Sequence, residues 1–326
     1  MLSMSDSLVE TAMGMIESES ATTVEKIEML IELGMGFQQK PDNHQSLHYA
    51  VELYRRAIEE CAQEYPLLNV RAKVGMATAL LSLASEGPDL LLEAKDTYIA
   101  AIPVLQELAS PEEVAEAQMN LGLTWQSLVP FGEGNIADCI QAYQQALRVF
   151  SWQAYPREYA ILHNNMAIAY LSLPKNLDQQ HLPQTLAVQS LEEALKRINL
   201  SCHPSEYAML QNNLANALQY LPSTHPVENN WRAIAAYDEA LKVRNPQDTP
   251  LEYANTISNK ANALCNLPDS QENPEAGNRN NLGQAQTYYQ QALQIFSDYS
   301  LEEQMQIVTQ ALREIEKELQ SAQFTN

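Results

Sequence analysis

The chain has 326 residues, of which 45% are hydrophobic, so it is long enough to bury a substantial core. It carries 41 acidic and 19 basic residues and a formal charge of −22, which disfavours binding to nucleic acid or to an anionic membrane surface. The cysteines are widely separated and form no C-x-x-C motif, so the sequence predicts neither a zinc site nor a redox site. Such spacing is typical of free thiols in a reducing compartment, and we expect a cytoplasmic protein.

The first segment, residues 1–21, is predicted to be a capping helix or a tail. Its apolar residues fall near helical spacing, at Leu8, Val9, Ala12, Met13 and Ile16. The segment contains acidic residues and lacks a basic stretch, which argues against a secretory signal peptide. No apolar run in the chain reaches about 18 residues, so no insertion into a membrane is expected.

From residue 22 to residue 300, a pattern of small, large and small side chains recurs at steps of 44, 45, 48, 46 and 52 residues. The copies are Ala50-x3-Tyr54-x2-Ala57, Ala94-x3-Tyr98-x2-Ala101, Cys139-x3-Tyr143-x2-Ala146, Ala187-x3-Leu191-x2-Ala194, Ala233-x3-Tyr237-x2-Ala240 and Ala285-x3-Tyr289-x2-Ala292. Offsets of four and three place each trio on one face of a helix. The small residues let a neighbouring helix approach closely while the large one fills the space beside it.

A second pattern precedes each trio and predicts the first helix of a hairpin. Its members are Leu33-Gly34, Met76-Ala77, Leu121-Gly122, Met166-Ala167, Leu214-Ala215 and Lys260-Ala261. Most of these helices are expected to begin at a proline, where the missing N–H costs nothing: Pro66, Pro111, Pro156, Pro204 and Pro250. Pro103 falls inside a second helix and should kink it or end it early. Residues 301–326 are predicted to be a capping helix with a charged outer face, followed by a tail.

These two patterns together resemble the tetratricopeptide repeat family, which pairs an L-G/A step on one helix with A-x3-Y/F-x2-A on the next. The resemblance implies an all-α fold: a right-handed α-solenoid of about six helical hairpins over residues 22–300, with capping helices at 1–21 and 301–326. The chain departs from the family in its longer period, against about 34 residues, and in lacking the early tryptophan of the first helix.

The candidate binding residues are asparagines that recur on the first helices. They are Asn120, Asn164, Asn165, Asn212, Asn213, Asn216, Asn255, Asn259 and Asn262. Asparagine is a mediocre helix former, so helix propensity does not explain its repeated use. In the resembled family such residues line a concave groove and hold an extended peptide, which a carboxamide can bind through its donors and its acceptor. The alternative is that these amides tie one hairpin to the next.

Other candidate sites are weaker in the sequence. Arg71, Lys73 and Lys260 are the cations that could clamp a terminal carboxylate, but they do not complete the family's pattern. His44 and His48 could meet on a helix face, but two imidazoles alone make a weak metal site. His163 is expected to be partly buried. The region around Ile31, Met35 and Val74 is more apolar than the later repeats and could bind a helix or the N-terminal segment.

The sequence thus predicts a non-catalytic scaffold or adaptor that binds a segment of another protein, of the kind found among assembly factors and chaperone-like adaptors. The alternative is a regulatory sensor that binds a short peptide or small effector and acts in trans. No catalytic residue, metal or cofactor is predicted, and the sequence does not indicate an oligomeric state. The Gln-rich, Lys-poor composition is typical of a bacterial protein.

Overall fold

The computed structural model describes residues 21–39, 41, 44–61, 64–173, 182–221, 226–273, 275 and 277–321. Within these ranges the chain consists of helices and loops and contains no β-strand. None of the described helices is long and apolar enough to cross a membrane. The predicted N-terminal cap over residues 1–21 lies outside the described residues, except for Ala21.

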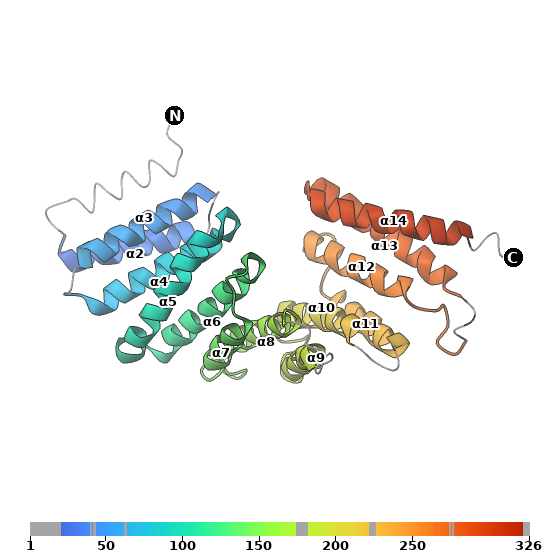
Figure 1. The fold of residues 1–326 in the computed structure, drawn as a ribbon, viewed down its shortest axis with the longest axis horizontal. Helices are drawn as coiled ribbons and strands as arrows, with labels where there is room; N and C mark the ends of the chain where they lie inside the picture. The colour runs from blue at the N-terminus through green and yellow to red at the C-terminus, as the bar shows by residue number, and fades with distance from the viewer. Residues whose placement is uncertain are drawn as a thin grey trace, which may run out of the picture. The chain divides into compact units, whose positions relative to one another are not determined.

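The chain divides into two compact units, Met1–Ser151 and Trp152–Asn326. Unit 1, drawn from blue to green in Figure 1, contains three helical hairpins. They are α2 (Thr23–Gln39) with α3 (His44–Cys61), α4 (Pro66–Ser82) with α5 (Pro88–Leu108), and α6 (Pro111–Ser127) with α7 (Ile136–Ala146). The short 3₁₀ helices η1 (Ala84–Glu86) and η2 (Val129–Phe131) lie inside the second and third hairpins. The first helices contact one another, α2 with α4 and α4 with α6, so they form one layer.

Unit 2 repeats this arrangement and adds a final helix (Figure 1). Its hairpins are α8 (Pro156–Leu171) with α9 (Leu182–Leu195), α10 (Pro204–Tyr220) with α11 (Pro226–Ala240), and α12 (Pro250–Cys265) with α13 (Arg279–Asp298). Here α10 contacts both α8 and α12, so the first helices again form one layer. The predicted all-α fold of stacked helical hairpins is therefore confirmed in each unit.

The large residue of each small–large–small trio lies in the core. Tyr54, Tyr98, Tyr143 and Tyr237 are 0% exposed. Each of their hydroxyls reaches a polar side chain on the first helix of its own hairpin, as when Tyr54 Oη donates to Gln38 Oε1 at 3.0 Å. Burying a hydroxyl without a partner is costly, so this polar contact lets a tyrosine serve where phenylalanine would otherwise be expected.

Glycines on the first helices make room for two of these rings. A Cβ added to Gly34 would lie 2.9 Å from the Tyr54 ring, and one added to Gly75 would lie 2.4 Å from it. The Tyr54 ring is therefore held between α2 of its own hairpin and α4 of the next. Gly122 makes the same close approach to Tyr143, where an added Cβ would lie 2.5 Å from the ring.

Helix ends follow the predicted signals. The helices α4, α6, α8, α10 and α12 all begin at the predicted prolines. Ser110 also caps α6 with a capping box, in which Glu113 N–H donates to Ser110 Oγ at 3.3 Å and Ser110 N–H donates to Glu113 Oε1 at 3.4 Å. Pro103 was expected to kink α5 or to end it early; the early end is wrong, because α5 continues through Pro103 to Leu108, and the kink stays a prediction.

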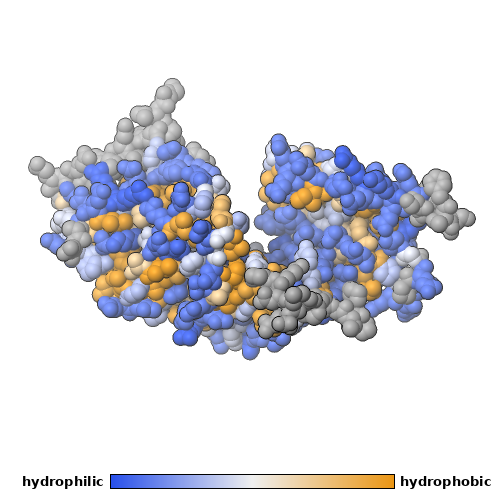
Figure 2. Space-filling model, viewed as in Figure 1, coloured by the Kyte–Doolittle hydropathy of each residue, from blue (hydrophilic) through white to orange (hydrophobic). Residues whose placement is uncertain are grey.

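The predicted C-terminal helix is present as α14 (Glu302–Ser321), which packs on α13 and buries Val308 and Ile315. Its charged residues, among them Glu303 and Arg313, are exposed. On the face drawn in Figure 2, several apolar patches lie over α4 to α6 of unit 1. The exposed residues Ile99, Val104 and Leu108 of α5 belong to unit 1.

Candidate functional site

The predicted asparagines of unit 2 do not all have the same surroundings. At the contact between α8 and α10, Asn213 Nδ2 donates to Asn164 Oδ1 at 2.5 Å. Asn164 Nδ2 in turn donates to Asn165 Oδ1 at 3.3 Å, and Asn212 Nδ2 donates to Asn213 Oδ1 at 3.0 Å. Asn164, Asn165 and Asn212 are buried. These four amides join one hairpin to the next.

The same hydrogen-bond chain continues from α10 to α12. Asn216 Nδ2 donates to Asn213 Oδ1 at 3.5 Å, and Asn216 Oδ1 accepts from Tyr237 Oη at 2.5 Å. Gln219 Nε2 donates to that hydroxyl at 2.6 Å, and Gln219 Oε1 accepts from Asn262 Nδ2 at 3.1 Å. We call Asn164, Asn165, Asn212, Asn213, Asn216, Gln219 and Asn262, with Tyr237, the amide chain. For its members, the geometry matches the hairpin-tying alternative of the sequence analysis.

Two of the predicted asparagines, Asn255 and Asn259 of α12, lie outside the amide chain. Asn255 is exposed and Asn259 is half-buried, and neither side chain has a hydrogen-bond partner among the described residues. Spacings of four and three place Asn255, Asn259 and Asn262 on one face of the helix. We call this surface the α12 amide face. The side chains of Asn255 and Asn259 are available there to bind another molecule.

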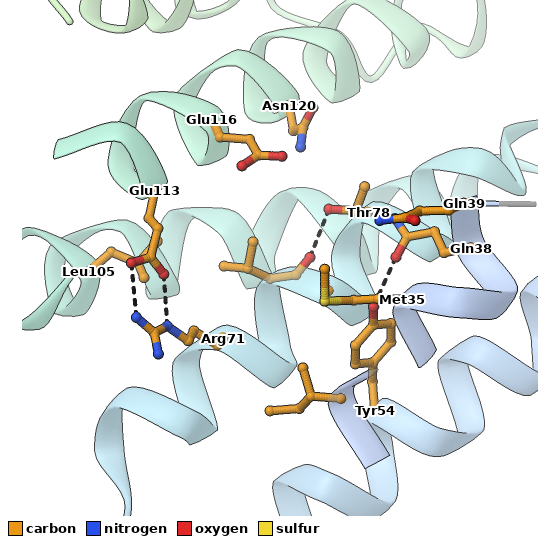
Figure 3. Close-up of a pocket in the computed structure, with 13 residues that line it drawn as sticks. Met35, Gln38, Gln39, Tyr54, Arg71, Thr78, Leu105, Glu113, Glu116 and Asn120 are labelled. Atoms are coloured by element: carbon orange, nitrogen blue, oxygen red, sulfur yellow. Dashed lines mark hydrogen bonds and ion pairs between the residues drawn. The ribbon is translucent and has the colours of Figure 1, made fainter. Parts of the chain in front are cut away.

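Asn120, the remaining predicted residue, belongs to unit 1 and lines a cavity of about 480 Å³ (Figure 3). The lining comes from α2, α4 and α6, together with Tyr54 of α3 and Leu105 of α5. The sequence analysis placed Ile31, Met35 and Val74 in an apolar region, and all three line this cavity. It did not identify the cavity itself.

Arg71, Lys73 and Lys260, the cations considered for a carboxylate clamp, have other partners or positions. Arg71 pairs with Glu113 through two hydrogen bonds, of 2.8 and 3.0 Å, which hold the pKa of the Glu113 carboxyl below its usual value. Lys260 is only 8% exposed and its Nζ donates to Asp238 Oδ1 at 2.5 Å. Lys73 lines a different surface depression in unit 1.

The two histidines at the start of α3 share one carboxylate. His44 Nδ1 lies 3.4 Å and His48 Nε2 lies 3.0 Å from Glu86 Oε1. This contact joins α3 to η1 of the following hairpin and is largely exposed. Across the part of the chain that the structure describes, no group of three or more His, Cys, Asp or Glu side chains could hold a metal ion.

His163 is partly buried on α8, as expected from the sequence. Its Nδ1 lies 3.1 Å from Ser190 Oγ on α9, and its ring packs against that of Tyr159 at a tilt of 57°, with 4.5 Å between the centroids. Burial lowers the pKa of His163 below its usual value of 6.5. The neutral imidazole therefore packs between the two helices of one hairpin.

This lowered pKa predicts how the stability of unit 2 depends on pH. The unfolded chain binds a proton at His163 near pH 6.5, whereas the folded chain does so only at lower pH, so the free energy of unfolding should fall as pH drops below 6.5. His163→Gln should reduce this dependence between pH 6.5 and the lower pKa of the folded state. Urea denaturation of both proteins across this range measures the difference, and identical pH profiles would show that His163 is not responsible.

Comparisons with known proteins identify the fold. No protein-family model matches the chain, and no curated protein matches it in sequence. Among solved structures, the apo form of the quorum sensor NprR from B. thuringiensis superposes with a TM-score of 0.65 at 13% identity, covering 93% of this chain and 74% of that one.

A second solved structure supports the same fold. It is a signal transduction ATPase with numerous domains from Pyrococcus horikoshii, which has a tetratricopeptide repeat sensor. It superposes with a TM-score of 0.54 at 15% identity, covering 92% of this chain and 43% of that one. Both likenesses concern the backbone, since the identities are low. The chain therefore has a fold of the tetratricopeptide repeat type.

Proposed function

We propose that the chain is a non-catalytic binding module that holds a segment of another protein against its first helices. The observation that carries this proposal is the α12 amide face, where Asn255 and Asn259 have no partner among the described residues. In the same unit, the amide chain uses the other asparagines to hold the hairpins together. The amides of Asn255 and Asn259 are therefore not needed for hairpin packing and are available for binding.

The geometry of the amide face suits an extended peptide. Residues three or four apart on a helix have Cβ atoms about 5–6 Å apart. An extended chain advances about 3.3 Å per residue, so every second peptide unit recurs at a comparable spacing. Each carboxamide offers two donors and one acceptor, which can pair with a peptide C=O and N–H whatever the peptide side chains are.

In this proposal the protein is a cytoplasmic adaptor of a bacterial cell, without a cofactor or metal. Support for a reducing compartment comes from the four cysteines, which are all free thiols, with Cys61 and Cys139 buried. The strong negative charge favours a protein partner over nucleic acid.

The proposal is tested with a peptide selected against the full chain from a random twelve-residue library. The double variant Asn255→Ala/Asn259→Ala should bind that peptide more weakly, because each lost hydrogen bond costs about 0.5–1.5 kcal/mol and two together lower affinity roughly 5- to 150-fold. Isothermal titration calorimetry measures the affinity. The free energy of unfolding should change by less than about 0.5 kcal/mol, as for surface substitutions.

The matched control is Asn280→Ala, which removes an exposed asparagine of the same unit at the start of α13. This variant should bind the selected peptide as well as the original chain does. Full affinity in the Asn255→Ala/Asn259→Ala variant would rule out the α12 amide face as the binding surface.

A regulatory sensor that binds a short peptide or a small effector, and acts in trans, is the second candidate function. Two observations favour it: the similarity to a quorum sensor, and a unit 1 cavity of about 480 Å³. Cavities that bind small ligands usually measure about 300–1,000 Å³. Small-angle scattering distinguishes the two functions, because a sensor should change its radius of gyration when it binds its effector, and a passive adaptor should not.

A further inference from the structure

The unit 1 cavity has an apolar middle between two polar ends (Figure 3). Ile31 and Met35 from α2 and Val74 from α4 form the apolar part, beside the ring of Tyr54. Met35 is 46% exposed and lines the cavity together with Ile31 and Val74. A large apolar side chain from a partner would cover Met35 and remove this surface from water.

The charges around the cavity favour a cationic partner over an anionic one. Arg71 is the cation in the lining, and Glu113 and Glu116 are the anions. The charge of Arg71 is already compensated by its paired hydrogen bonds with Glu113, and Glu28 of α2 adds a further negative field at Arg71. An incoming carboxylate would therefore meet a compensated cation and an excess of negative charge, whereas a lysine or arginine would be attracted.

The polar end opposite the Arg71–Glu113 pair is built from amides and a hydroxyl. Figure 3 shows Gln38, Gln39 and Thr78 together at this end, and Asn120 beside Glu116 on α6. Gln38 accepts a hydrogen bond from Tyr54 through its Oε1, which leaves its Nε2 hydrogens for another acceptor. These amides suit the backbone of a bound segment and carry no charge preference. The choice of partner therefore depends on the apolar middle and on the carboxylates.

We propose that the unit 1 cavity takes one large apolar side chain of a partner segment in which that residue is flanked by lysine or arginine. This inference rests on the proposed function in one respect, since both assume a bound protein segment, but it uses different residues in a different unit. A second copy of this chain is the less suitable occupant, because each copy carries a charge of −22 and would be repelled.

The test uses three synthetic nine-residue peptides with blocked ends. The lysine peptide has a central leucine with two lysines on each side in a serine background, and the glutamate peptide replaces the lysines with glutamates. The third peptide is the lysine peptide with a central alanine. The full chain is labelled with ¹³C at its methionine methyl groups, and NMR follows Met35 in the cavity, with Met209 and Met305 of unit 2 as internal controls.

The lysine peptide should shift the Met35 methyl signal to saturation while Met209 and Met305 stay in place. The alanine peptide should bind about tenfold more weakly, because it buries less apolar surface. The glutamate peptide should leave Met35 unshifted. Raising the salt concentration from about 0.05 to 0.5 M should weaken binding of the lysine peptide, because salt screens the attraction between exposed charges. Equal shifts from the lysine and glutamate peptides would overturn the proposal, and so would a response confined to Met209 or Met305.

Charge variants provide the second arm. Glu28→Gln and Glu116→Gln should each lower the affinity for the lysine peptide by about threefold, and should reduce the dependence of that affinity on salt. Glu28 is exposed, so its removal leaves the fold intact. Glu303→Gln on α14 makes the same change of net charge in unit 2 and should leave the affinity for the lysine peptide unchanged. Unchanged affinity in both the Glu28→Gln and the Glu116→Gln variants would overturn the proposal.

Failure of this inference is distinguishable from failure of the proposed function. If the lysine peptide does not shift Met35 but a selected peptide still depends on Asn255 and Asn259, the inference fails and the proposed function stands. If the lysine peptide shifts the Met35 signal but the affinity of no selected peptide depends on Asn255 and Asn259, the inference stands and the α12 amide face is not a binding surface. In the Asn255→Ala/Asn259→Ala variant, the Met35 titration should be unchanged.

Discussion

Replacing Gly75 with alanine is expected to lower the free energy of unfolding of unit 1 by about 3 kcal/mol, the upper end of the usual cost of overpacking a core. The added Cβ would lie 2.4 Å from Tyr54 Cε1 and 2.5 Å from Tyr54 Cζ, which no ordered structure tolerates. The ring has no room to move, because it is fully buried and Gly34 confines its other side. The backbones of α2 and α4 would have to separate.

Urea denaturation followed by circular dichroism measures this loss, and hydrogen exchange locates it, with faster exchange expected in α2, α3 and α4. Gly36→Ala is the matched control, because a Cβ at Gly36 of α2 would meet nothing within 4 Å. That substitution should stabilise the helix by roughly 0.5–1 kcal/mol, since alanine loses less backbone entropy than glycine. Similar effects of the two substitutions would mean that Tyr54 does not fill the junction between the hairpins.

Asn213→Ala is expected to lower the free energy of unfolding of unit 2 by about 2–4 kcal/mol. The substitution leaves Asn164 Oδ1 and Asn212 Nδ2 without the partners they have in the amide chain. Both residues are buried, and each buried polar group left without a hydrogen bond costs about 1–3 kcal/mol. The higher helix propensity of alanine offsets up to about 0.7 kcal/mol of this loss of stability. Thermal and urea denaturation measure the loss.

The control for Asn213→Ala is Asn259→Ala, one hairpin further along. The side chain of Asn259 has no hydrogen bond among the described residues, so its removal should leave the free energy of unfolding nearly unchanged. From sequence alone, Asn213 and Asn259 are equivalent, because both belong to the recurring asparagines of the first helices. A neutral Asn213→Ala substitution would mean that the amide chain contributes nothing to the packing of α8 against α10.

The fold was accessible from the sequence because its determinants are local and repeat. The trio around Tyr98, for example, needs only the spacing of Ala94, Tyr98 and Ala101 to define a buried helix face, and all three are buried in the structure. The prolines predicted the starts of the helices equally well. Their preference for the first helical turn comes from the fixed φ angle and missing N–H of proline itself, so it does not depend on distant contacts. Pro103 is the exception, because the packing of α5 outweighs the local preference to end the helix there.

The roles of the asparagines could not be predicted in the same way. Asn164 and Asn213 are 49 residues apart, and their hydrogen bond depends on how closely α8 approaches α10. Sequence spacing places both on the first helices but does not say which amides meet. The cavity of unit 1 was hidden for the same reason, because its lining comes from five helices, from α2 to α6.

The central claim is that the asparagines of unit 2 divide into those that hold the hairpins together and those that bind a partner. The most direct test measures the free energy of unfolding and the affinity for a selected peptide in the same two variants, Asn213→Ala and Asn259→Ala. We predict that Asn213→Ala loses about 2–4 kcal/mol of stability, whereas Asn259→Ala keeps its stability and binds the peptide more weakly. Equal losses of stability in the two variants, or full peptide affinity in Asn259→Ala, would contradict this division.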